Sequence, residues 1–153
     1  MKRAVAVLVV VLGLAMAACG TTVVPQEPRV ITVPGIVGSD MALEIVDETG
    51  ELVDAVAVTG EALGAVAMPL EGPIAVWAGA ERNEVRLVWI SFSCETTGRL
   101  TISNPNRITV QAGDFAVCDA IGNHRAVDLE FRGPVNAPAL QVELLGVEGK
   151  EKG

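Results

Sequence analysis

Short runs of alternating hydrophobic and polar residues recur through the second half of the chain. The alternation is clearest where Val127, Leu129 and Phe131 are separated by charged residues. The same alternation occurs over residues 99–103, 107–111 and 140–144. Successive side chains of a strand point to opposite faces, so each run predicts a strand with one buried face and one solvated face.

Two of these runs predict a β-hairpin. They are joined by Asn104-Pro105-Asn106, a sequence of turn-forming residues. Asn can hydrogen-bond its own backbone two residues further on, and Pro fixes φ for a tight turn. We therefore predict a hairpin over residues 99–111.

The segment Val85–Cys94 carries hydrophobic residues on both alternating faces, which predicts a central strand covered on both sides. The first half of the chain is less regular. Residues 41–47 and 52–58 could form a hairpin over Glu48-Thr49-Gly50, and Glu61–Met68 could form a short helix. Turn signals every 8–12 residues favour a mainly β fold, a small antiparallel β-sandwich with an immunoglobulin-like or jelly-roll-like general layout.

The amino terminus has the features of an export signal. Lys2 and Arg3 precede a 15-residue apolar or small-residue run, Ala4–Ala18, which is shorter than the about 20 residues that span a membrane. The run ends in Met16-Ala17-Ala18-Cys19-Gly20, which resembles the lipobox of bacterial lipoproteins, although Met16 stands where Leu is usual. This resemblance implies a signal peptide over residues 1–18, a diacylglycerol on Cys19 and a domain held outside the cytoplasm on a bacterial membrane.

Processing at this site would leave 135 of the 153 residues and change the net charge from −8 to −10, because Lys2 and Arg3 would be removed. Such acidity argues against nucleic acid as a partner, since phosphate contacts need clustered Lys and Arg. Three prolines within Thr21–Gly35 predict an extended, lipid-anchored tether over residues 19–35. The β-rich domain is then expected over residues 36–147, with a polar tail over 148–153.

Cys94 and Cys118 would remain after export, in a compartment where disulfides persist. Both lie at the ends of predicted strands, Val85–Cys94 and Phe115–Cys118, and a bridge would close a 25-residue loop. The predicted disulfide has an alternative, a nucleophilic Cys118 activated by His124. In layout, the chain resembles the small two-cysteine β-rich lipoproteins of high-GC bacteria. It lacks the marks of an immunoglobulin domain, because the cysteines are too close and Trp89 precedes the first of them.

No catalytic, metal-binding or cofactor-binding pattern is found in the sequence. His124 is the only histidine, which excludes zinc sites built on a histidine pair. Tyrosine is absent, and the aromatic residues are two Trp and three Phe. Most of these fall within predicted strands, where core packing is the ordinary role. Trp77, in a small-residue segment, is the best candidate for an exposed binding contact.

Three functions remain open from the sequence. The first is a non-enzymatic binding or interaction module of the cell envelope, which should show an apolar pocket or patch rimmed by carboxylates, for a small ligand or an envelope protein. The second is a structural or assembly accessory that pairs through an uncharged edge strand. The third is a small hydrolase, in which two carboxylates or Cys118 and His124 would converge in a cleft.

Overall fold

A computed structural model describes residues 26–66, 72–92, 94–104, 106–113 and 122–146. The predicted signal peptide, Cys19, Cys118, the predicted strand 115–118 and the polar tail lie outside the described residues. Within those ranges the chain forms β1 (Arg29–Val33), β2 (Met41–Asp47), β3 (Leu52–Ala57), α1 (Gly60–Val66), β4 (Ile74–Ala78), β5 (Glu84–Phe92), β6 (Thr97–Asn104), β7 (Arg107–Ala112), β8 (Gly122–Phe131), a 3₁₀ helix η1 (Ala137–Ala139) and β9 (Gln141–Leu145).

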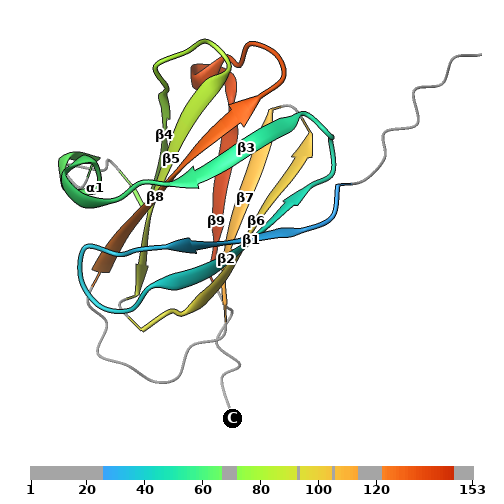
Figure 1. Ribbon diagram of the computed structural model, residues 1–153. Coiled ribbons are helices and arrows are strands. Elements are labelled where there is room, and N and C mark those ends of the chain that lie inside the picture. Colours follow the sequence, from blue (N-terminus) through green and yellow to red (C-terminus); the bar gives the residue numbers. More distant parts are fainter. Residues whose placement is uncertain (1–25, 67–71, 93, 105, 114–121, 147–153) are drawn as a thin grey trace, which may run out of the picture.

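The strands form two sheets that face each other, so the predicted mainly β sandwich is confirmed (Figure 1). Sheet A has the strand order β1-β2-β6-β7-β9, and sheet B has the order β3-β8-β5-β4. All pairings of sheet B are antiparallel. In sheet A, however, β2 pairs with β6 and β7 pairs with β9 in parallel. The predicted hairpin over 99–111 is confirmed as β6 and β7, and the Asn104 side chain accepts a hydrogen bond from the Asn106 amide at 2.9 Å.

The predicted hairpin between residues 41–47 and 52–58 is wrong, although both strands exist. β2 belongs to sheet A and β3 to sheet B, so the turn between them carries the chain from one sheet to the other. Buried Asp47 holds this turn, because its carboxylate accepts hydrogen bonds from the backbone amides of Thr49 and Leu52 at 2.9 Å each. Gly50 adopts a φ of 72°, a conformation that favours glycine.

The tether predicted over residues 19–35 is wrong from Arg29 to Val33, because these residues form β1 and pair with β2. The ordered sandwich therefore begins before residue 36. Pro28 and Pro34 lie immediately outside β1, where the missing amide hydrogen does not interrupt the pairing.

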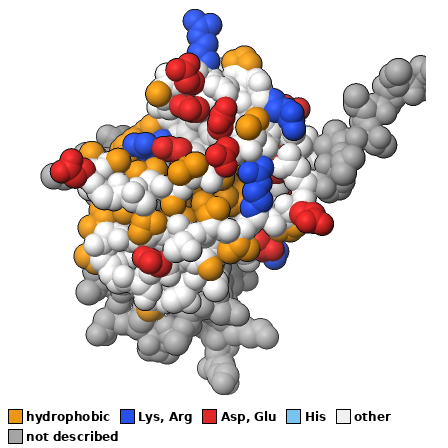
Figure 2. All heavy atoms as spheres, in the orientation of Figure 1, with side chains coloured by type: hydrophobic (Ala, Val, Ile, Leu, Met, Phe, Trp, Pro, Cys, Tyr) orange, Lys and Arg blue, Asp and Glu red, His pale blue; other side chains and the backbone are white. Residues whose placement is uncertain are grey.

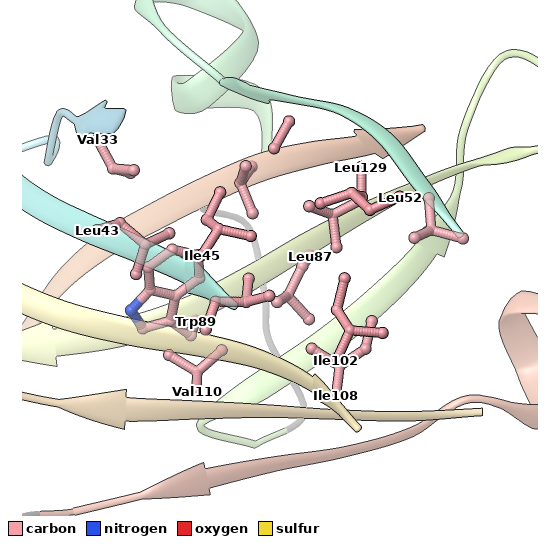
Figure 3. Close-up of a cluster of buried hydrophobic side chains, with 14 of the residues drawn as sticks. Val33, Leu43, Ile45, Leu52, Leu87, Trp89, Ile102, Ile108, Val110 and Leu129 are labelled. Carbon is pink, nitrogen blue, oxygen red and sulfur yellow. The ribbon is translucent and has the colours of Figure 1, made fainter. Parts of the chain in front are cut away.

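The main core lies between the sheets, where inward side chains of both pack together (Figure 3). Its labelled members in the figure are Val33, Leu43, Ile45, Leu52, Leu87, Trp89, Ile102, Ile108, Val110 and Leu129. A second, smaller cluster lies on the outer face of sheet B, where Leu63 and Val66 of α1 cover Val88 and Ala126. The central strand β5 is thus covered on both sides, as predicted, and α1 confirms the short helix expected near residues 61–68.

Candidate functional site

The hydrophobic core ends in polar side chains at one end of sheet B. Ser91 on β5 and Asn123 on β8 are cross-strand partners, and Arg125 follows on the same inward face as Val127. All three side chains are buried. Burying a polar group costs free energy unless the group is hydrogen-bonded. The hydrogen-bond partners of these three side chains therefore determine what their burial costs.

Arg125 is completely buried and joins four other segments of the chain to β8. Its Nε donates to Ser91 Oγ at 2.6 Å, and its Nη1 donates to the Val33 carbonyl at 2.8 Å. Its Nη2 donates to the carbonyls of Ser39 at 2.8 Å and Glu95 at 3.0 Å. The guanidinium therefore ties the end of β1, the β1–β2 loop, β5 and the β5–β6 turn to β8.

The four groups that accept hydrogen bonds from Arg125 are uncharged. Burial lowers the pKa of the guanidinium from its ordinary value, and the negative charges of Glu95 and Asp40 oppose that effect. Since an arginine remains charged across the physiological range, a buried positive charge sits at this end of the core, with two carboxylates as its electrostatic counterparts.

Asn123 fixes the β1–β2 loop from the same side. Its Oδ1 accepts a hydrogen bond from the Val37 amide at 3.1 Å. A Cβ at Gly35 would lie 2.0 Å from Asn123 Nδ2, so a larger residue there would displace this side chain. Nδ2 itself is buried and has no hydrogen-bond partner among the residues that the structure describes.

Glu95 lies in the β5–β6 turn and is only 3% exposed. Burial raises the pKa of its carboxyl group, while a hydrogen bond with the Phe92 backbone and the charge of Arg125 act in the opposite direction. A carboxyl group whose pKa is higher in the folded state than in the unfolded chain favours the fold at low pH, and this contribution is lost as the pH rises through the folded-state pKa. The ionised Glu95 is therefore a destabilising group.

A cavity of about 500 Å³ opens beside Glu95 at this end of the sandwich, between the ends of strands from both sheets. Its apolar walls include Met41, Pro73, Trp89, Phe92, Leu144 and Leu145. Ser91, Glu95 and Gln111 are the polar residues of the lining. Phe92 and Leu145 are 40% and 39% exposed, so part of the apolar lining is open to solvent. The volume and the largely apolar lining are typical of small-molecule sites.

The exposed edges of β1 and β3 offer a different surface. Val30, Val53 and Val56 are exposed there, and Figure 2 shows a band of hydrophobic side chains across this face with acidic side chains mainly above it. The Arg29 side chain donates hydrogen bonds to the carbonyls of Val53 at 3.1 Å and Leu52 at 3.3 Å. The carbonyls of Val53 and Leu52 are thus already hydrogen-bonded within the molecule, which argues against their use in pairing with a partner strand.

The structure places the residues singled out from the sequence in separate locations. Trp77 lies on β4, half-buried against the cluster under α1, and it does not line the cavity. The tryptophan at the cavity is Trp89, for which the sequence suggested core packing alone.

His124 lies on the opposite face of β8 from Arg125. Cys94 directly precedes Glu95 in the β5–β6 turn, and its bridge to Cys118 remains a prediction because Cys118 lies outside the described residues.

Sequence reasoning missed Ser91, Asn123 and Arg125, although a signal for them existed. Continuing the alternation backward from Val127 places Arg125 and Asn123 on the buried face of β8. Polar residues at inward positions of two strands could have indicated a buried polar cluster. Glu95 carried no such signal, because it lies in an irregular turn.

Comparisons with known proteins do not add a family. No protein-family model, curated protein or solved structure matches the chain. Within the described ranges, no His, Cys, Asp and Glu side chains gather in a way that could hold a metal ion, and no helix is long and apolar enough to cross a membrane.

Proposed function

We propose that this protein is a non-enzymatic binding module of a bacterial cell envelope, exported on its signal peptide and anchored by a lipid on Cys19. The observation that carries the proposal is the apolar cavity of about 500 Å³ with the buried acidic residue Glu95 in its wall. Ligand pockets combine a mainly apolar lining with a few placed polar groups, and this cavity has that composition.

The bonding of the polar groups supports binding rather than catalysis. The Ser91 hydroxyl accepts a hydrogen bond from Arg125 at 2.6 Å, so the group beside it is a cation and not a general base. Glu95 is the single carboxylate among the described residues that line the cavity. A glycosidase-type site needs two carboxylates across the scissile bond.

Binding in the cavity can be measured with its own tryptophan. The chain has two tryptophans, and Trp77→Phe leaves Trp89, in the cavity wall, as the only indole. We expect octanol to change the emission of this variant saturably. Leu144→Phe, which narrows the cavity, should weaken octanol binding by about tenfold, a loss of about 1.4 kcal/mol.

The matched control is Leu140→Phe, the same substitution beside the same strand at a half-buried position outside the cavity lining. It should leave octanol affinity within about twofold of the parent. Absence of any saturable change with octanol, or equal losses in both variants, would contradict the cavity as the binding site.

The anchor is tested separately in the native host. Cys19→Ala should abolish metabolic labelling with a fatty acid, because the thiol is the acceptor of the diacylglycerol. The domain should then appear in soluble form or as an uncleaved precursor. Unchanged labelling and membrane attachment of the variant would rule out the lipoprotein assignment.

A further inference from the structure

We infer that the cavity takes a ligand with an apolar alkyl body and a terminal ammonium group, with Glu95 as the counter-ion. This inference rests on the proposed function and adds the chemical class of the ligand. It starts from Glu95, a buried residue of the cavity wall that forms no ion pair with any cation among the described residues.

The ion pairs among the described residues do not include Glu95. They join Arg29 to Asp54, Arg86 to Asp128, Arg99 to Glu44 and Arg107 to Glu143. The nearest buried cation, Arg125, reaches the backbone carbonyl of Glu95 at 3.0 Å rather than its carboxylate. Buried carboxylates in proteins are ordinarily paired with a cation. Glu95 has no such partner among the described residues, so a bound ligand can supply its counter-ion.

The charges around this end of the core also favour a cation. Arg125 interacts electrostatically with Glu95 and Asp40, so one guanidinium stands beside two carboxylates. The donors of Arg125 are directed at neutral acceptors in the protein. The chain as a whole carries a net charge of −8, which favours the approach of cations over anions.

The desolvation cost of the buried Glu95 also favours a cationic ligand. Glu95 loses most of its hydration when the protein folds, whether or not a ligand is present. An arriving ammonium group would therefore meet an acceptor that is already desolvated, which strengthens the pairing. A destabilising charge at a cavity is the kind of feature that binding sites retain at the expense of stability.

The apolar walls of the cavity favour an alkyl chain as the remaining part of the ligand. Trp89, Leu144 and Leu145 can bury an alkyl chain, with a gain that grows with the apolar area covered. An alkyl carboxylate would bring a second negative charge to Glu95 and should be rejected. An alcohol of equal length should bind by its chain alone.

Three octyl compounds separate these cases, with Trp89 emission as the readout in Trp77→Phe protein at pH 8. We expect octylamine to bind at least about tenfold more tightly than octanol, as for a charge-assisted hydrogen bond, and octanoate to bind more weakly than octanol. Glu95→Gln should remove the preference for the amine and leave octanol binding within about twofold. Glu143→Gln, which changes the net charge equally but lies on β9 outside the cavity lining, should keep the preference.

Acid provides a second measurement that needs no variant at position 95. Protonation of Glu95 removes its charge, so the preference for octylamine should fade as the pH falls through the raised pKa of Glu95, while octanol binding stays constant. Octanol binding without a preference for the amine would overturn this inference and leave the binding module intact. Failure of all three compounds to bind would instead overturn the proposed function.

Discussion

Replacement of Arg125 by methionine should lower the free energy of unfolding by about 3 kcal/mol or more. The variant leaves the buried carbonyls of Val33 and Glu95, the buried hydroxyl of Ser91 and the partly buried carbonyl of Ser39 without the donor they share. Each unsatisfied buried polar group costs about 1–3 kcal/mol. Arg125→Lys should lose nearly as much, because an ammonium group cannot reproduce the planar set of donors that reaches all four acceptors.

Denaturant unfolding followed by tryptophan emission measures this loss, and Arg86→Met is the matched control. Arg86 also lies on sheet B and forms a two-pronged ion pair with Asp128, with both contacts at 2.7 Å. Its side chain is 30% exposed and that of Asp128 is 43% exposed, so this pair should contribute less than about 1 kcal/mol. Equal losses in the two variants would show that Arg125 contributes no more than a surface ion pair.

The contrast between these two arginines shows what sequence patterns can and cannot predict. Arg125 and Arg86 differ in the face of the strand they occupy, and alternation with Val127 and Leu87 reveals that face without a structure. The same alternation located most strands of the second half. It also identified β5 as a strand with two buried faces, since Val88 packs under α1 while Leu87 and Trp89 enter the main core.

Strand partners were harder to predict than strand faces. Burial of one face constrains which residues point inward, but it does not select the neighbouring strand. The turn after Asp47 therefore looked like a hairpin, although it connects the two sheets. From the sequence, β1 was missed because the prolines on either side of it suggested an extended tether. The parallel pairing of β2 with β6 joins residues about 55 positions apart, which no local pattern relates.

The candidate site depends on the same long-range information. Met41 and Leu144 meet at the cavity because β2 begins there and β9 ends there, and no local pattern relates them. Glu95 became notable only through its burial and its position beside the cavity. The sequence therefore predicted the sandwich and the possibility of a pocket, while the residues of the pocket required the packed sheets.

Reduction of the predicted Cys94–Cys118 disulfide should lower the melting temperature by about ten degrees or more. A bridge across a 25-residue loop restricts the unfolded chain, and chain-entropy estimates give roughly 3 kcal/mol for such a loop. For a domain of this size, each kcal/mol corresponds to a shift of about 2–4 °C or more. Non-reducing mass spectrometry of the processed domain should detect no free thiol, since the proposed anchor would also occupy the thiol of Cys19.

Cys94→Ala should reproduce the effect of reduction, and adding Cys118→Ala should cost little more, because both changes remove the same bond. The turn that holds Cys94 also presents Glu95 to the cavity and its carbonyl to Arg125. Cys94→Ala combined with Arg125→Met should therefore destabilise the protein by less than the sum of the single losses, since either change releases this turn. Independent and additive losses from Cys94→Ala and Cys118→Ala would instead mean that the two cysteines pack separately. A Cys118 thiol that alkylates in native protein would exclude the bridge and restore the thiol-dependent hydrolase as the function to test.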